Sequence, residues 1–485
     1  MENAPRQRDV GRAIFRNSIV VTLGGVVFRV ASLAFSLFAI RLLGEVEFGR
    51  YSTVIAFCGI FGVFFELGLS QYAQRTLAQD RSRVTELFWN LVAVRLVLAL
   101  LGCAAIVSLS RFLGHAPEVT FGVFLMTATY LPAAFLTPLT VLLTADERFT
   151  IPTAIHVGGQ IVTIAIGLGM LLLGHGFLAL LYSGWIVMPL QIAVCAWVVI
   201  RHRLGPGPFQ VALSAWPDLI RSSVPFGLTA IALTYNFNAD AVILGHWHGD
   251  ATVGWYSAAY RLVFNFVALL GGFLTVITPT LSREYVSDPE RVGRVVRFSI
   301  QGLALFSLPV AVGVSLLAHP LVLLLYGESY APSGPILALI CWDVPLLLFN
   351  AFAGNVTAAM GLERPAAKIY LTSAIINVGL NLLLIPTFGM YAAVAATLIS
   401  DGLSAVRFYV LLRHRSELGR IASHLTRTAL AALLMGIIVL ATRTVNLPVS
   451  IACGMLAYGA LVVALRLIDP VALISRPRQI FGTIS

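Results

Sequence analysis

The amino-acid sequence predicts an all-α polytopic membrane protein with about 14 transmembrane helices. Its 485 residues are 58% hydrophobic and only 11% charged, far from the averages of soluble domains. Fourteen apolar stretches are each long enough to cross a hydrocarbon core of about 30 Å. Basic residues gather in every second gap between these stretches, which is the pattern of a protein that crosses a membrane repeatedly.

The predicted spans follow one another with short gaps along the whole chain. They lie at about residues 15–42, 51–74, 87–110, 119–143, 149–173, 177–200, 222–246, 252–281, 298–325, 335–359, 366–388, 390–412, 424–442 and 447–465. The first stretch is too long for the apolar core of a signal peptide and contains Arg29. We therefore expect it to be retained as a span.

The gaps alternate in charge. Of the 32 Lys and Arg residues, 24 fall in one set of alternate gaps, and the other set holds only Arg41, Arg50, Arg111 and Arg443. By the positive-inside rule, both termini are predicted to be cytoplasmic, as an even number of spans requires. The net charge of +10 is explained by loops that face anionic lipid headgroups, so no nucleic-acid partner is expected.

The gaps also exclude several kinds of enzyme. Lys368 is the only lysine and precedes Ile369, so the chain lacks the Gly-Lys-Ser/Thr of a nucleotide-binding P-loop. The longest outer gap, near 326–334, offers only Glu328 as an ionisable group, too little for a catalytic loop. The five cysteines are dispersed within the spans. We expect no catalytic residue and no covalently bound cofactor.

Short motifs recur at an offset of about 205–216 residues and indicate an internal duplication. Leu-Gly followed by Gly-Arg-Tyr-Ser (43–52) corresponds to Leu-Gly followed by Gly-Trp-Tyr-Ser (244–257), and Glu-Arg near 147 corresponds to Glu-Arg-Pro at 363–365. Parallel repeats are a transporter arrangement. The predicted parts are an N-lobe of spans 1–6 (1–200), a cytoplasmic interlobe linker (201–221), a C-lobe of spans 7–12 (222–412), and spans 13–14 with a cytoplasmic tail (413–485).

Several of these motifs resemble polysaccharide repeat-unit flippases of the Wzx type. They are Arg-Leu-Leu-Gly with Phe-Gly-Arg-Tyr (41–51), Gly-Trp-Tyr-Ser-Ala-Ala-Tyr-Arg-Leu (254–262), Tyr-Gly-Glu-Ser-Tyr-Ala (326–331) and Asn-Val-Gly-Leu-Asn-Leu-Leu-Leu-Ile-Pro-Thr-Phe-Gly (377–389). That family shares a superfamily with multidrug (MATE) exporters and lipid II flippases.

The resemblance implies a V-shaped, two-lobed transporter in the bacterial cytoplasmic (inner) membrane. The implied substrate is an undecaprenyl-pyrophosphate-linked oligosaccharide, flipped for O-antigen, capsule or exopolysaccharide synthesis by ion-coupled alternating access. The implied partners are a polysaccharide polymerase and chain-length proteins.

Eight ionisable residues lie inside the predicted spans, where a charge costs at least about 2.5–3.5 kcal/mol on insertion scales. They are Arg29, Glu66, Arg95, Asp240, Arg261, Asp343, Asp401 and Arg407. Arg407 is close enough to the cytoplasmic end of its span to snorkel.

The other three arginines, at positions 29, 95 and 261, sit about 13 Å or more from a span end. We predict that they face a shared cavity and bind phosphate or sugar acid, with Glu66 and Asp343 completing the substrate-binding set. The alternative is structural, with Arg29 paired to Glu66 across spans 1 and 2.

A second set consists of oxygen ligands near the outer side. Asp240, Asn381 and Thr397 are each about 10 Å below the outer surface, and Asn377 lies one turn from Asn381. One carboxylate, two amides and a hydroxyl suit Na⁺, and the set resembles the carboxylate-and-asparagine cation sites of some superfamily relatives. Interhelical hydrogen bonding is the structural alternative. Proton (H⁺) coupling through Asp240 or Asp401 is the other coupling hypothesis.

Three other functions remain open at this point. A MATE-type multidrug/cation antiporter would favour an acidic, aromatic N-lobe cavity, whereas Arg29 and Arg95 make this lobe basic. A membrane-embedded glycan polymerase or ligase is disfavoured by the short outer gaps. A silent scaffold for a glycan-assembly complex would not require buried arginines.

Overall fold

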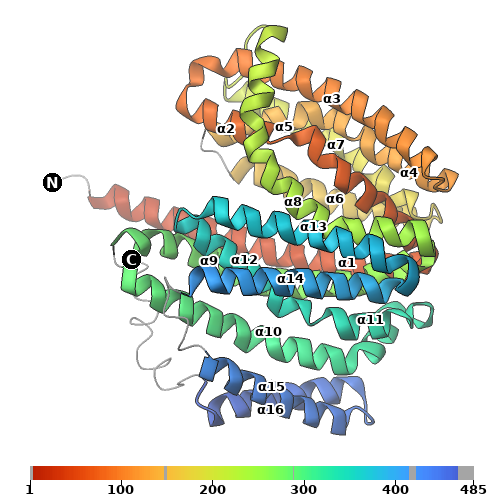
Figure 1. Ribbon diagram of the computed structural model, residues 1–485. Coiled ribbons are helices and arrows are strands. Elements are labelled where there is room, and N and C mark those ends of the chain that lie inside the picture. The colour runs from red at the N-terminus through yellow and green to blue at the C-terminus, as the bar shows by residue number, and fades with distance from the viewer. Residues whose placement is uncertain (1–3, 147–149, 288, 414–421, 468–485) are drawn as a thin grey trace. The chain divides into compact units, whose positions relative to one another are not determined.

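The computed structural model describes residues 4–146, 150–287, 289–413 and 422–467. Within these ranges, the side chains of residues 4–31, 63, 225–237, 270–287, 289–292 and 294 lie outside the description. Every regular element in the described ranges is a helix, which confirms the predicted all-α class (Figure 1). The chain divides into two compact units, Met1–Ile231 (unit 1) and Ala232–Ser485 (unit 2), and each is described by itself.

Unit 1 consists of seven long helices and the beginning of an eighth. They are α1 (Ala4–Glu66), α2 (Leu69–Gln79), α3 (Val84–Phe112), α4 (Pro117–Ala128), α5 (Tyr130–Ala145), α6 (Thr150–Leu172), α7 (Leu178–Arg201) and α8 (Trp216–His248), whose residues from 232 onward belong to unit 2. The predicted fourth span is thus two helices, α4 and α5, which meet at Thr129.

The first two predicted spans are not separated by a loop. Helix α1 is two helices joined at a kink. The kink is at Gly44, within the expected gap at 43–50, where φ is 70° and ψ is 174°. Glycine adopts this left-handed φ without the steric cost that a Cβ would add. The helical chain stops at Glu66, because Leu67 (φ 42°) and Gly68 (φ 76°) both leave the helical region. The second predicted span is therefore shared between α1 and α2.

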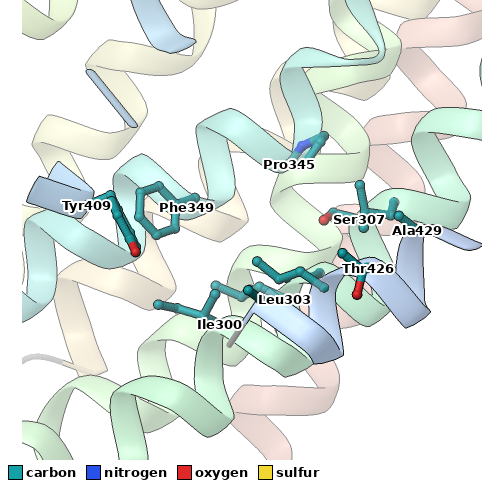
Figure 2. A pocket seen from close by; sticks show the side chains of 12 residues that line it. Ile300, Leu303, Ser307, Pro345, Phe349, Tyr409, Thr426 and Ala429 are labelled. Carbon is teal, nitrogen blue, oxygen red and sulfur yellow. The ribbon is translucent and has the colours of Figure 1, made fainter. Parts of the chain in front are cut away.

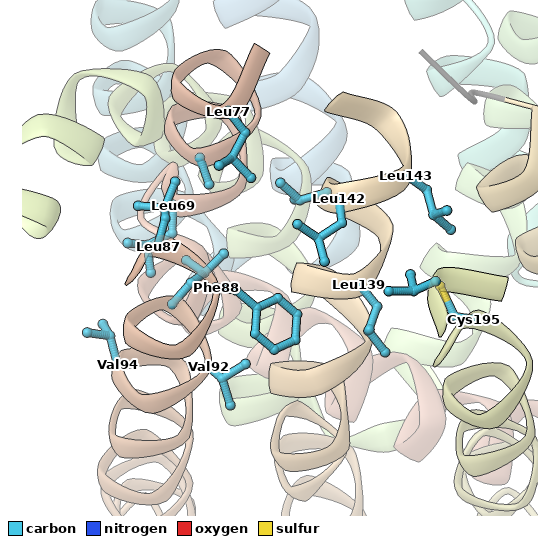
Figure 3. Close-up of a cluster of buried hydrophobic side chains, with 14 of the residues drawn as sticks. Leu69, Leu77, Leu87, Phe88, Val92, Val94, Leu139, Leu142, Leu143 and Cys195 are labelled. Atoms are coloured by element: carbon cyan, nitrogen blue, oxygen red, sulfur yellow. The ribbon is translucent and has the colours of Figure 1, made fainter. Parts of the chain in front are cut away.

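Apolar side chains from α2, α3, α5 and α7 form the core of one end of unit 1 (Figure 3). Leu69, Phe88, Leu142 and Cys195 are each 0–6% exposed and represent these four helices. Their burial joins helices that are far apart in sequence, and it holds the start of α2 close to α3. This packing positions the charged pair described below.

The segment predicted as an interlobe linker, 201–221, is attached to unit 1. Asn90 on α3 accepts hydrogen bonds through its Oδ1 from the backbone N–H of Ala212 (3.0 Å) and from Nε1 of Trp216 (3.1 Å). The rings of Trp89 and Phe209 pack edge to face, with 5.1 Å between their centroids. Asn90 is only 2% exposed, so the linker covers this end of α3. The boundary between the units falls beyond it, inside α8.

Unit 2 continues from α8 through eight further helices. They are α9 (Asp250–Ser287), α10 (Pro289–Tyr326), α11 (Ser333–Ile340), α12 (Asp343–Ala359), α13 (Glu363–Phe388), α14 (Met390–Leu412), α15 (Ala422–Thr442) and α16 (Leu447–Ala464). The tenth predicted span is the pair α11 and α12, which are bent by 42° relative to each other. Helix α12 packs against α9, α10 and α14, and α13 packs against α14.

The last two helices lie against α10, so the C-terminal pair belongs to unit 2 (Figure 1). A pocket of about 620 Å³ opens between α10, α12, α14 and α15. Its lining is mostly apolar and includes Leu303, Phe349 and Tyr409 (Figure 2).

Ten helices or continuous helix pairs among the described residues are long and apolar enough to cross a membrane, or eleven if the bent α11–α12 pair forms one span. One of them, Ser32–Gln79, covers parts of two predicted spans. The protein is therefore a multi-pass membrane protein. The count of 14 spans stays a prediction.

Candidate functional site

Unit 1 holds a partly buried ion pair between Arg95 on α3 and Glu66 at the end of α1. The Arg95 guanidinium donates to a carboxylate oxygen of Glu66 and, at 3.0 Å, to Oγ of Ser70 on α2. The other oxygen of Glu66 accepts from the backbone N–H of Ser70 at 3.1 Å. Because α1 ends at Glu66 and α2 begins three residues later, one carboxylate both caps α2 and neutralises the arginine.

The two side chains differ in exposure. The Arg95 side chain is 8% exposed and that of Glu66 is 37% exposed. The Nε of Arg95 is buried and has no hydrogen-bond partner among the described residues. A desolvated guanidinium with an unused N–H donor can bind an anionic oxygen. That oxygen would either bind beside Glu66 or replace it as the partner of Arg95.

The other arginines of the predicted substrate set are less well defined. The Arg29 side chain lies outside the described residues, so neither its predicted cavity position nor its alternative pairing with Glu66 is tested. The described partner of Glu66 is Arg95. Arg261 lies on α9 with an exposed side chain. Arg407 donates a hydrogen bond to Oγ1 of Thr372.

Unit 2 contains a layer of buried polar side chains that comes from α8, α9, α12, α13 and α14. Asp240 on α8 is 2% exposed. Its carboxylate accepts from the hydroxyl of Tyr256 on α9 and from the backbone N–H of Ala241 at 3.1 Å. Tyr260, one turn further along α9, interacts electrostatically with Asp240. The sequence analysis assigned no role to either tyrosine, although their spacing of four residues indicates a common helix face.

The predicted amide ligands form part of a hydrogen-bonded chain. Nδ2 of Asn381 donates to Oδ1 of Asn377 at 3.0 Å, and Nδ2 of Asn377 donates to Oγ of Ser400 at 3.3 Å. Ser400 in turn donates to the backbone carbonyl of Thr397 at 3.0 Å. These four side chains are at most 1% exposed. Both the cation-site hypothesis and interhelical hydrogen bonding are compatible with this chain.

Two oxygens of this set are buried without a hydrogen-bond donor. Oδ1 of Asn381 and Oγ1 of Thr397 have no partner within the described part of the chain. The hydroxyl of Thr397 lies near Tyr256, which also contacts Asp240. The four predicted cation ligands are therefore linked in a series. Asn381 bonds to Asn377 directly, Asn377 is linked to Thr397 through Ser400, and Thr397 is linked to Asp240 through Tyr256. No group of three or more His, Cys, Asp or Glu side chains suited to a metal ion occurs among the described residues.

Asp343 and Asp401 lie together in the same layer. Asp343 begins α12 and is fully buried, and Asp401 is near the middle of α14 with 4% exposure. Their carboxyl groups interact electrostatically with each other. Asp343 was predicted to bind substrate and Asp401 to couple protons, and the sequence offered no sign of this proximity. It depends on the packing of α12 against α14.

A multi-pass helical protein with ionisable groups buried among its helices is an integral membrane protein. The chain matches the family of polysaccharide biosynthesis proteins over residues 38–335, which is more than half of its length, and it belongs to that family.

Named relatives agree with this membership. The chain is 30% identical to the probable flippase AglR of Haloferax volcanii over 173 residues, which cover 34% of this chain and 36% of AglR. It is 24% identical to the succinoglycan biosynthesis transport protein ExoT of Rhizobium meliloti over 318 residues, covering 63% of this chain and 61% of ExoT. The matches thus span between about a third and three fifths of these relatives.

The fold is also similar to a solved structure. The lipid II flippase MurJ in an inward closed conformation superposes with a TM-score of 0.76 over 91% of this chain and 98% of that chain, at 15% sequence identity. At this identity the similarity concerns the fold alone. It agrees with the predicted all-α polytopic fold class.

Proposed function

We propose that this protein is a flippase, not an enzyme, that moves undecaprenyl-pyrophosphate-linked oligosaccharide repeat units across the bacterial inner membrane. Membership of the polysaccharide biosynthesis family supports the substrate class. Relatives that are named as flippases or transport proteins support the activity. The surface polysaccharide would then be an O-antigen, a capsule or an exopolysaccharide, with a polymerase and chain-length proteins as partners.

The observation that carries this proposal in the structure is the buried guanidinium of Arg95. A diphosphate leaving water needs its charge compensated, and guanidinium binds phosphate oxygens with two parallel hydrogen bonds. In the described state Glu66 provides the negative charge that a diphosphate would bring. We propose that the diphosphate replaces Glu66 at Arg95 during transport, with Arg29 and Arg261 as further cationic groups on its path.

We propose an N-lobe of residues 1–200, an interlobe linker of residues 201–221 and a C-lobe of residues 222–412, with both termini on the cytoplasmic side. The concentration of basic residues in alternate gaps supports this orientation. Residues 413–485 form the proposed C-terminal addition.

We further propose ion coupling through Na⁺ bound by Asp240, Asn377, Asn381 and Thr397. The buried acceptor oxygens Oδ1 of Asn381 and Oγ1 of Thr397, which lack donors among the described residues, support this assignment. Such a cation drives turnover only if it binds one conformation better than another.

The test of the flippase proposal is transport in proteoliposomes that contain a fluorescent polyprenyl-diphosphate oligosaccharide, with a membrane-impermeant quencher to report the accessible leaflet. Arg95→Ala should abolish flipping, and Arg95→Lys should restore it only in part, because an ammonium lacks the planar pair of donors. Arg111→Ala is the matched control, since Arg111 is exposed at the other end of the same helix. Full flipping by correctly folded Arg95→Ala protein would contradict the proposal.

The exposure of Glu66 favours one second candidate, a MATE-type exporter of organic cations. At 37% exposure, the acid is the more accessible member of the ion pair. Glu66→Gln should then abolish export of a fluorescent cation such as ethidium. Unchanged flipping of the lipid-linked oligosaccharide in the same variant, with no cation export in the unmodified protein, would reject this candidate.

A further inference from the structure

A small pocket of about 250 Å³ opens at one end of unit 1, where several apolar spans end together. It lies between the short helix η1 (Arg81–Arg83), the C-terminal end of α5 and the residues that follow α7. The predicted spans around it end at about residues 74, 143 and 200, on the side of the chain that carries most of its basic residues. The pocket therefore lies at the level of lipid headgroups.

An exposed tryptophan beside the pocket supports this level. Trp197, one turn before the end of α7, is 57% exposed. The guanidinium carbon of Arg201 lies 5.1 Å from the centre of its ring. A tryptophan with a basic neighbour at the end of an apolar helix is typical of the membrane–water interface. The pocket begins two residues further along the chain, at Arg203.

The floor of the pocket is apolar and well packed. Leu77 on α2 and Leu142 on α5 line it, with 2% and 5% exposure, and both belong to the core of this end of unit 1 (Figure 3). Val84 and Leu204 also line the pocket and pack against the same core. A floor of this kind favours the CH₂ groups of a ligand, because their contact with it removes apolar surface from water.

The rim of the pocket carries two arginines and one aspartate. Nη1 of Arg81 lies 2.6 Å from Oδ1 of Asp146, and Nη2 of Arg81 donates to the backbone carbonyl of Ala145 at 3.4 Å. These contacts connect η1 to the end of α5, and Asp146 offsets the charge of Arg81. Arg203 lines the pocket from the third side and has no ion-pair partner within the described part of the chain. The rim therefore has a surplus positive charge.

The way in which α7 ends places Arg203 at an unusual backbone position. Its φ of 56° is left-handed, its N–H donates to the carbonyl of Ile200, and the N–H of Leu204 donates to the carbonyl of Val199, both at 3.0 Å. Glycine is the usual residue at this position of a helix ending, because any Cβ adds a steric cost. Arg466 ends α16 with the same hydrogen bonds and a φ of 51°. The chain thus contains the same helix ending with and without the pocket.

We propose that this pocket binds the phosphate of an anionic phospholipid from the adjacent membrane leaflet. The phosphate lies between the guanidinium groups of Arg81 and Arg203, and the glycerol with the start of the acyl chains lies on the apolar floor. Arg81 uses two of its five N–H donors in its contacts with α5, which leaves donors for phosphate oxygens. Basic pockets between membrane helices bind anionic headgroups in this way. The site does not depend on the flippase proposal.

The size and lining of the pocket favour a phospholipid over other carriers of phosphate. Its volume of about 250 Å³ is below the roughly 300–1,000 Å³ of typical small-molecule sites, so it suits one phosphate with glycerol but not an oligosaccharide. Inorganic phosphate contacts the arginines but gains nothing from the apolar floor. A zwitterionic headgroup brings its own positive charge towards the surplus charge of the rim. Phosphatidylglycerol has none of these disadvantages.

Photoreactive phosphatidylglycerol, with a diazirine close to its glycerol, tests the site in purified protein. Peptides that contain Val84 or Leu204 should be labelled, because both residues line the floor. Unlabelled phosphatidylglycerol should compete, whereas equal concentrations of phosphatidylcholine or inorganic phosphate should not. Labelling of other peptides only would overturn the site. Equal competition by phosphatidylcholine would overturn its preference for anionic lipid, and equal competition by inorganic phosphate would overturn a lipid as the ligand.

The variant Arg203→Gly removes the guanidinium and gives the left-handed position its usual residue, so the fold should be retained. Labelling of the pocket peptides should fall about fivefold, the upper end for an exposed charged contact. Arg466→Gly is the matched control, since it makes the same change at the same kind of helix ending outside the pocket. Undiminished labelling in Arg203→Gly protein would contradict the proposal, as would an equal fall in Arg466→Gly protein.

A second variant changes the charge of the rim in the opposite direction. Asp146→Asn removes the carboxylate that offsets Arg81 and should increase the labelling by phosphatidylglycerol. Added NaCl should reduce the labelling, because salt screens exposed charges. A general loosening of the pocket would lower labelling in both variants, so opposite changes in Arg203→Gly and Asp146→Asn protein identify charge as the cause. A fall in both would overturn the phosphate contact.

Discussion

The two units differ in what surrounds their buried charged side chains. In unit 1, Arg95 meets an acid, a hydroxyl and the end of a helix within one short reversal of the chain. In unit 2, Asp343 meets further acids and no donor among the described residues. In unit 1 the charges of the pair cancel and most of its polar groups have a hydrogen-bond partner. In unit 2 the acids outnumber the basic groups around them.

The difference indicates different roles. A satisfied ion pair changes state only when a competing charged group displaces one partner, so Arg95 and Glu66 suit an anionic substrate. A layer with surplus acceptors gains stability from any small cation that enters it, so unit 2 suits Na⁺ or a proton. The predictions below test this contrast.

The largest expected effect is the loss of Glu66. Glu66→Ala leaves the Arg95 guanidinium buried without a counter-charge and should destabilise the protein by about 2–3 kcal/mol, less than the roughly 3–5 kcal/mol of a fully buried pair because Glu66 is partly exposed. Thermal unfolding in detergent measures it. Adding Arg95→Met should recover part of the loss, and Glu118→Ala, at an exposed glutamate on α4, should change little. No recovery in the double variant would show that the charge is not the cause.

A smaller effect is expected at Asn90, the second satisfied polar contact of unit 1. Asn90→Ala leaves the Ala212 N–H and the Trp216 Nε1–H without their acceptor and should cost about 2 kcal/mol. Trypsin should then cleave after Arg203 faster than in the unmodified protein. Asn446→Ala, which removes an exposed helix cap at α16, should leave this cleavage rate unchanged. Equal protection in the Asn90→Ala protein would mean that other contacts hold the linker.

The smallest effect is stabilisation by sodium. At ten times its dissociation constant, Na⁺ should stabilise the protein by about 1.4 kcal/mol, measured as a higher Tm in NaCl than in choline chloride at equal ionic strength. Asp240→Asn and Asn381→Ala should lose this shift, whereas Arg95→Lys should retain it because that residue belongs to the other unit. A shift that persists in Asp240→Asn protein would argue against the proposed ligand set.

The spans and the amide pair could be predicted because their signals are local. Hydrophobic length and the charge of adjacent gaps depend only on neighbouring residues, and they predicted the helices α3, α6, α7, α13 and α14 closely. The spacing of Asn377 and Asn381 places both on one helix face, and they do form a hydrogen bond. The expected gap at 43–50 is reduced to a kink at one residue, Gly44, because glycine alone provides the backbone change.

Which charges meet depended on tertiary structure. The sequence by itself predicted that Glu66, Arg95, Asp343 and Asp401 lie inside apolar spans and need a partner or water, because a charge in the hydrocarbon core is costly. It did not determine their partners. Arg95 reaches Glu66 because α1 ends at Glu66, before the non-helical Leu67 and Gly68, and packs against α3. Asp343 comes within electrostatic range of Asp401, 58 residues away in sequence, because α12 packs on α14, and no local pattern encodes this packing.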